Sequence, residues 1–149
     1  MNKYKWIIWV ILFGIAGCAA TTKYVVSPDW DKSKLATVYI YRTDVSFHRF
    51  NPEKPYFYID NMEVGKLGTG EAIAIEVLPG PHVVTAKEPI LFIPTYESGR
   101  LEFDAKQNEK YYVRYSKEFG GVNSTGNSPK VSDKTSIQLA NEEDFGARR

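Results

Sequence analysis

Short runs of alternating apolar and polar residues recur along most of this chain. In residues 36–42, Val38 and Ile40 point one way while Tyr39 and Tyr41 point the other, which is the period of two expected of a β-strand. Turn-forming residues separate the runs, and the sequence has no amphipathic helical stretch among them. Strands are predicted over residues 36–42, 55–60, 63–67, 71–78, 82–88, 99–104, 110–116 and 135–139. The pattern therefore predicts an all-β fold, a single antiparallel β-sandwich over residues 35–140.

The residues between these runs predict turns and loops. Asp60-Asn61 predicts a tight turn, because both residue types tolerate left-handed backbone geometry, and Pro79-Gly80-Pro81 predicts a second reversal. Residues 120–134 are rich in Gly, Ser, Asn and Thr and are expected to form a long loop. The charged tail at residues 141–149 is expected to be frayed.

An apolar insert at residues 89–94 interrupts the alternation. Two prolines bracket four large apolar residues, and proline cannot donate to a sheet ladder, so regular pairing is not expected at either end. One interpretation is a loop or edge strand that covers the core. The other is an exposed apolar patch, with Ile90 and Phe92 as candidate contacts to a partner or to a bilayer surface.

Tyrosines occupy the second face of two predicted strands: Tyr39, Tyr41, Tyr56 and Tyr58. If the opposite faces hold the core, these four rings could form an exposed aromatic platform that binds sugars or a protein. Alternatively, a loop or the N-terminal segment covers them, or they form cross-strand pairs.

The N-terminus carries an uncharged run over residues 6–20, which is too short for the roughly 20 residues of a membrane-spanning helix. Lys3 and Lys5 precede it, as in a secretory signal. The run ends in residues 15–18, Ile-Ala-Gly-Cys, which resemble a bacterial lipobox. This resemblance implies cleavage between Gly17 and Cys18, removal of residues 1–17 as a signal peptide, and lipidation of Cys18. The alternative is a buried apolar helix with an incidental cysteine.

Cys18 is the only cysteine, so disulfides, zinc clusters and thiol catalysis are not available once its sulfur is alkylated. Bacterial lipoproteins of this type carry two or three acyl chains, and two chains are enough for stable membrane attachment. Cleavage would leave 132 residues (149 − 17), of which 18–34 would form a lipidated tether. As a flexible coil the tether would span about 20–25 Å, unless Tyr24 or Trp30 pins part of it to the domain.

Charge and chemistry restrict the function further. Without Lys3 and Lys5, 17 basic residues face 18 acidic ones, so no basic field exists to attract nucleic acid. No hydrolytic triad or phosphate loop is recognisable, so no catalytic residue, cofactor or metal is predicted. His82 is expected to bond the turn backbone or pack on a tyrosine. A two-histidine metal site with His48 stays open, although no tight ligand spacing suggests one.

Three segments carry a family resemblance: residues 58–60, residues 63–67 and residues 78–84. They resemble the PEGA-type β-sandwich repeat, in which a strand ends in Asp, a Val-Gly follows a short turn, and a later strand begins with Pro-Gly-x-His. With residues 111–114 added, the chain is similar to small bacterial lipoproteins built on one such domain of unknown function. The resemblance implies an immunoglobulin-like sandwich and says little about activity. Asn61-Met62, where glycine is usual, and the apolar insert depart from the pattern.

These observations predict a lipid-anchored envelope protein whose β-sandwich is a non-catalytic binding or structural module. An envelope protein is the expected partner, peptidoglycan binding through the tyrosine face is the alternative, and an enzyme is the least favoured class. Because Ala19 rather than aspartate follows the cysteine, we expect an outer-membrane anchor facing the periplasm. In a cell with one membrane, the domain would stand outside the cytoplasmic bilayer.

Overall fold

The computed structural model describes residues 22–44, 52–123 and 130–148. The predictions on Gly17, Cys18 and His48 lie outside these residues. The described elements follow in chain order: η1 (Lys32–Lys34), β1 (Ala36–Arg42), β2 (Tyr56–Ile59), β3 (Met62–Lys66), β4 (Ala72–Val77), β5 (Gly80–Ile90), β6 (Ile93–Ala105), β7 (Lys110–Asn123), β8 (Lys130–Ala140) and α2 (Glu142–Gly146).

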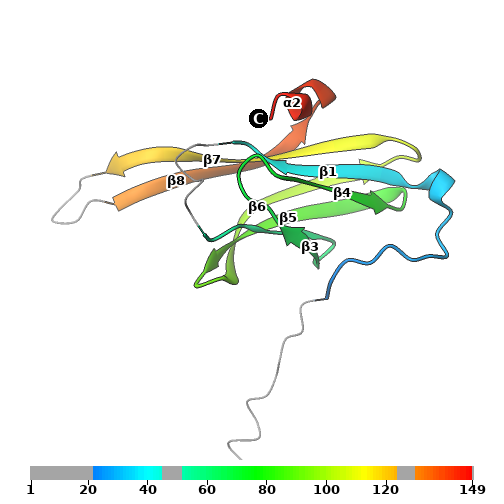
Figure 1. Cartoon of the computed structure of the whole chain (residues 1–149), viewed down its shortest axis with the longest axis horizontal. Coiled ribbons are helices and arrows are strands. Elements are labelled where there is room, and N and C mark those ends of the chain that lie inside the picture. The colour runs from blue at the N-terminus through cyan, green and yellow to red at the C-terminus, as the bar shows by residue number, and fades with distance from the viewer. Residues whose placement is uncertain (1–21, 45–51, 124–129, 149) are drawn as a thin grey trace, which may run out of the picture.

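Two four-stranded sheets pack face to face, with strand orders β4-β1-β7-β8 and β3-β2-β5-β6 (Figure 1). The predicted all-β sandwich is therefore confirmed. The named strands pair antiparallel with one exception, since β1 and β7 run parallel. This pairing is possible because the chain passes through the other sheet between β1 and β7 and does not return by a hairpin.

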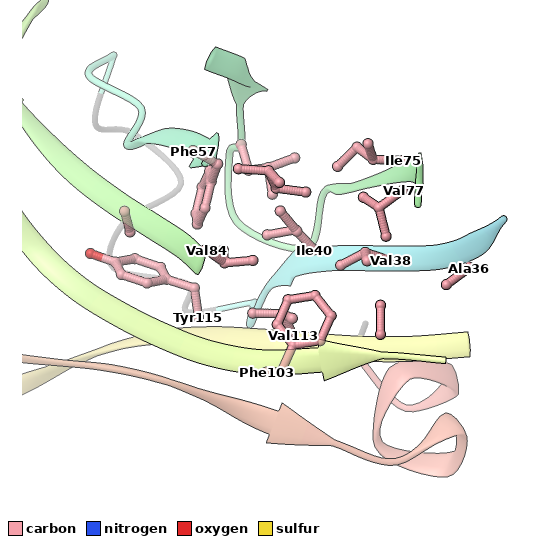
Figure 2. Close-up of a cluster of buried hydrophobic side chains, with 14 residues drawn as sticks. Ala36, Val38, Ile40, Phe57, Ile75, Val77, Val84, Phe103, Val113 and Tyr115 are labelled. Carbon is pink, nitrogen blue, oxygen red and sulfur yellow. The ribbon is translucent and has the colours of Figure 1, made fainter. Parts of the chain in front are cut away.

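The core lies between the sheets and is built from their inward-facing side chains (Figure 2). Val38 and Ile40 are fully buried there, as the alternation in β1 predicts. The ring of Phe57 from one sheet meets the ring of Tyr115 from the other edge-on, with centroids 5.4 Å apart. This contact ties the two layers together near the end of the sandwich that carries the β5–β6 hairpin.

The apolar insert does not interrupt pairing, so that expectation is wrong. Pro89 lies opposite Pro94 and Ile90 opposite Ile93, which makes the insert the end of a long β5–β6 hairpin. β2 pairs with β5 only as far as Lys87. Beyond that point β5 has one neighbouring strand, and β6 is the edge of its sheet, so a missing proline N–H need not remove a ladder bond.

The long loop predicted over residues 120–134 is also wrong in part. β7 continues to Asn123 and β8 begins at Lys130, with Val122 opposite Val131. Residues 124–129 lie outside the described part of the chain. Main-chain hydrogen bonds do not depend on side-chain type, so a hairpin can extend through a sequence that is rich in turn-forming residues.

The C-terminal tail is folded and not frayed. Asn141 caps α2 by accepting a hydrogen bond from the Asp144 backbone N–H at 2.7 Å. Glu142, Glu143 and Asp144 occupy the first turn, where negative charge interacts favourably with the helix dipole. A short helix with one aromatic residue, Phe145, is therefore held against the outside of the sandwich.

Candidate binding surface

Tyr39 and Tyr41 lie on the outer face of their sheet, but α2 covers them. Tyr41 has no exposed surface and Tyr39 is half-buried. The Phe145 ring centroid lies 5.2 Å from that of Tyr39 and 5.3 Å from that of Tyr41, and Tyr39 stacks on Tyr112 at 5.1 Å. The exposed platform is wrong for this pair, because the chain supplies its own aromatic cover.

Tyr56 and Tyr58 are also buried, with 6% and 5% of their surface exposed. The Lys66 ammonium lies 4.2 Å above the Tyr56 ring, and the Lys87 ammonium lies 4.7 Å above the Tyr58 ring. Burial raises the pKa of Tyr58, and the carboxylate of Glu63 adds to this rise. Neither tyrosine pair offers an open face to a sugar ring, so the peptidoglycan alternative loses the surface on which it depended.

The end of the β5–β6 hairpin is exposed and apolar. We call residues 90–93 the hairpin tip. Its residues expose the following fractions of their surface: Ile90 52%, Leu91 80%, Phe92 58% and Ile93 66%. Of the two interpretations of the insert, exposure of an apolar patch is the one that holds, although Ile93 also belongs to the edge strand β6. Four consecutive large apolar side chains in water point to a contact with something apolar.

The backbone of the tip is unusual for its sequence. Leu91 and Phe92 form a two-residue turn with φ values of 51° and 65°. Both residues of such a hairpin turn need positive φ, and Asn-Gly is the usual solution. Bulky side chains in this conformation cost on the order of 1 kcal/mol or more each. Exposed apolar residues therefore occupy positions where polar or small residues would be more stable.

Side chains from the body fix this turn. The Phe92 backbone N–H donates to Glu53 Oε1 at 3.0 Å, and the Tyr56 hydroxyl donates to the Phe92 carbonyl. The hydrogen-bonding groups of the Phe92 peptide are thus satisfied within the protein. As a result, the tip could enter an apolar environment without exposing these two groups unpaired.

A buried polar cluster supports the base of the hairpin. Glu88, next to Pro89, accepts a hydrogen bond from the Tyr115 hydroxyl, and its second oxygen lies 3.3 Å from the Lys117 ammonium. Burial and the bond to Glu88 raise the pKa of Tyr115 well above its usual value. The contacts run from β5 to β7 across the interior. They fix the strand that carries the tip against the opposite sheet.

His82 has the structural role that the sequence predicts. Its Nε2 donates to the Leu78 carbonyl at 2.7 Å, and its Nδ1 lies 2.7 Å from Asp60 Oδ2. The other oxygen of Asp60 accepts from the Val83 backbone N–H at 2.9 Å. Asp60 and His82 therefore clamp two turns together. No group of three or more His, Cys, Asp or Glu side chains within the described ranges is placed to hold a metal ion.

The N-terminal segment is pinned to the body from Thr22 onward. The Glu63 backbone N–H donates to Thr22 O at 2.9 Å, the Tyr24 backbone N–H donates to Glu63 O at 2.9 Å, and the Tyr24 hydroxyl donates to Glu76 O at 3.0 Å. Burial is the main cause that raises the pKa of Tyr24 to about 12. Of the two alternatives for the segment up to residue 34, the one in which Tyr24 pins part of it to the domain is therefore confirmed, and a flexible coil is wrong for this part. Among the described residues, no helix is long and apolar enough to cross a membrane.

A polar hollow of about 300 Å³ lies beside α2. Its lining mixes both charge signs and includes Tyr41, Asp44, Arg114, Asp144 and Arg148. Three buried polar atoms here have no hydrogen-bond partner among the described residues: the Tyr41 hydroxyl, Arg114 Nε and Arg148 Nε. The hollow is polar, whereas the tip is apolar. No local sequence pattern predicts the hollow, because β1, β7 and α2 each supply part of its lining.

Together these features define an all-β sandwich domain whose described residues include two covered tyrosine pairs and an exposed apolar hairpin tip. A family model described as "Protein of unknown function (DUF2846)" matches residues 32–130, and the chain belongs to this family. Comparison with curated proteins gave no match, and comparison with solved structures gave none either. The expectation of a domain of unknown function is thus confirmed.

Proposed function

We propose that this protein is a lipid-anchored protein of the bacterial cell envelope whose β-sandwich is a non-catalytic binding and structural module. The lipobox-like residues 15–18 support the anchor, with Cys18 as the lipidated residue. The likeness to PEGA-type domains and to small bacterial lipoproteins supports the same assignment. Ala19 favours an outer-membrane anchor with the domain in the periplasm.

The exposed hairpin tip is the observation that carries the binding role. The tyrosines of the two outer faces are covered, Tyr39 and Tyr41 by α2 and Tyr56 and Tyr58 by lysines. The tip has no such cover and is held in a costly backbone conformation by Glu53 and Tyr56. A surface of this kind is typical of a protein that works in contact with another component.

The partner that we propose for the module is an envelope protein at the same membrane. The body begins at Thr22, only four residues after Cys18, so a partner must reach it close to the bilayer. The polar hollow beside α2 supplies a surface that such a protein could bind with charged side chains. Peptidoglycan stays the second candidate, now without a tyrosine face to support it.

The anchor is tested by feeding cells an alkyne-tagged fatty acid and comparing the wild-type chain with Cys18→Ser. The wild type should incorporate the tag and sediment with membranes, and the variant should do neither. The partner is tested by photo-crosslinking in intact cells from exposed positions such as Glu102 and Glu143. A discrete protein adduct that disappears in Cys18→Ser is expected. If the experiment yields no protein adduct and the protein is not retained on the cell wall, the proposed binding role is contradicted.

A further inference from the structure

The hairpin tip and the start of the described chain lie on the same side of the molecule. In Figure 1 the described chain begins below the sheet β3-β2-β5-β6, and the β5–β6 hairpin ends on this lower side, whereas α2 lies at the top. The same sheet holds both features, because Glu63 of β3 pins the N-terminal segment and β5 and β6 form the tip.

The chain between the anchor and the body is short. Thr22 is already hydrogen-bonded to Glu63, so only residues 19–21 separate it from Cys18. Four Cα–Cα steps span at most about 14 Å. A lipidated Cys18 therefore holds the lower side of the sandwich close to the bilayer surface, not at the end of a long tether.

We infer that the hairpin tip lies in the interface of the bilayer that holds the lipid anchor, as a second membrane contact of the same chain. This inference rests on the proposed lipidation of Cys18. The lipid surface is favoured over a protein as the occupant because the anchor makes the contact intramolecular. A tethered surface meets the tip at a high effective concentration, whereas a protein partner must first be encountered.

The chemistry of the tip fits a shallow position in the membrane interface. Leu91 and Phe92 present apolar surface, and the Phe92 N–H and carbonyl are already bonded to Glu53 and Tyr56. An unpaired peptide group would be costly in the bilayer, so this pairing removes a main obstacle to insertion. Tyr96, half exposed, follows on β6, and tyrosine is enriched at membrane interfaces.

The charged residues behind the tip limit its depth. Glu97 is exposed one residue after Tyr96, and Lys87 lies opposite it in the hairpin. These side chains stay in the headgroup region while residues 90–93 reach about 5–10 Å into the boundary between headgroups and acyl chains, as amphipathic elements do. The hairpin contacts the membrane without crossing it.

The mature chain is well suited to a direct test because its only native sulfhydryl is consumed by lipidation. A cysteine introduced as Ile93→Cys is then the single site for a polarity-sensitive fluorophore. The lipidated protein is reconstituted into phosphatidylethanolamine–phosphatidylglycerol vesicles and floated on a density gradient. Glu143→Cys on α2, on the opposite side of the molecule, serves as the matched control.

On reconstitution into vesicles, we expect the fluorophore at Ile93→Cys to gain several-fold in emission intensity and to shift its emission to shorter wavelength. Nitroxide-labelled lipids should quench it. The Glu143→Cys probe should show neither change. Leu91→Cys is the second reporter, and it should behave like Ile93→Cys.

The outcomes distinguish failure of the tip–membrane contact from failure of the lipid anchor. If the protein floats with the vesicles but the probes at residues 91 and 93 ignore the nitroxide lipids, the tip is not in the interface and only the anchor stands. If the probes become shielded from water as the amount of protein per vesicle rises, but are not quenched by the nitroxide lipids, the tip contacts a second copy of the chain. The inference is then overturned. If the protein does not float, the lipid anchor fails first.

Discussion

The Tyr39/Tyr41 face and the hairpin tip both lie outside the core of this sandwich, and they differ in what covers them. On the sheet β4-β1-β7-β8, Tyr39, Tyr41 and Tyr112 are covered by Phe145 of α2. At the other surface, residues 90–93 expose between 52% and 80% of their surface. The chain covers one apolar surface with its own helix and leaves the other open.

The covered tyrosine face is structural, whereas the open hairpin tip is available for contact. Tyrosines with hydroxyl tips look suited to binding, yet Phe145 of the five-residue helix α2 covers their rings. The tip has no polar handle in its side chains, yet Glu53 and Tyr56 hold it out in a strained turn. A surface is available for binding when the fold holds it open, whatever its residue type suggests.

The largest predicted effect comes from removing the aromatic cover. Phe145→Ala should lower the free energy of unfolding by roughly 2 kcal/mol, because Phe145 is partly buried against three tyrosine rings and full burial would give a larger loss. The measurement is chemical denaturation of the chain, with unfolding monitored by circular dichroism.

Phe92→Ala is the matched control, since it deletes the same ring from the exposed tip. It should change the free energy of unfolding by less than about 0.5 kcal/mol. Equal losses of unfolding free energy in Phe145→Ala and Phe92→Ala would mean that the Phe92 ring is packed against the body. The tip would then not be an open surface.

The second prediction separates stability from contact. Leu91→Asn combined with Phe92→Gly places the preferred residues in the left-handed turn and should raise the free energy of unfolding by about 1–2 kcal/mol. The same double variant should lose lipid quenching of a probe at Ile93→Cys. A stabilised variant that still reaches the lipid would show that these two side chains do not make the contact.

A third prediction contrasts two tyrosine hydroxyls. Tyr56→Phe removes the donor to the Phe92 carbonyl and should destabilise the protein by about 1 kcal/mol. Tyr41→Phe removes a buried hydroxyl that has no partner among the described residues, so it should be neutral or stabilising by up to about 1 kcal/mol. Thermal or urea unfolding of both variants measures the two changes in stability. A larger loss in Tyr41→Phe than in Tyr56→Phe would contradict the prediction.

The smallest effect concerns the pinned N-terminal segment. The pKa of Tyr24 is raised to about 12 in the folded protein, against about 10 in the unfolded chain. The neutral hydroxyl therefore contributes stability that is complete below pH 10 and is lost as pH rises through 12. Because Tyr24 is only half-buried, solvent screening should keep this contribution below about 1 kcal/mol.

Urea unfolding of wild type and Tyr24→Phe at pH 9 and pH 11 measures the difference. Wild type should lose more stability over this interval than the variant. Parallel losses would indicate that the hydroxyl does not hold the segment to Glu76.

Much of the sandwich follows from the period-two pattern. All eight strands were predicted, and β1 has the predicted bounds, because alternation and turn residues are local signals. The ends of β5 and β6 were missed because pairing past Pro89 depends on where β2 stops, which no local pattern records. The parallel pairing of β1 with β7 is a property of the whole topology.

The candidate surfaces were harder to predict for the same reason. The sequence placed the tyrosines on outer faces correctly, but whether an outer face is open depends on α2, which is distant along the chain from β1. One signal was available: Asn141 followed by three acidic residues and Phe145 is a capped helical turn with a single apolar side chain. The exposure of the tip was one of two interpretations, and only the three-dimensional arrangement distinguishes them.

The proposed anchor and the membrane contact of the tip both require a lipid at Cys18, and the intact mass of the protein extracted from membranes tests this lipid most directly. We predict a chain that begins at Cys18, lacks residues 1–17, and carries the added mass of a diacylglyceryl group with or without a third acyl chain. A full-length chain of 149 residues with a free thiol would contradict the anchor, the short spacer and the membrane contact of the tip together.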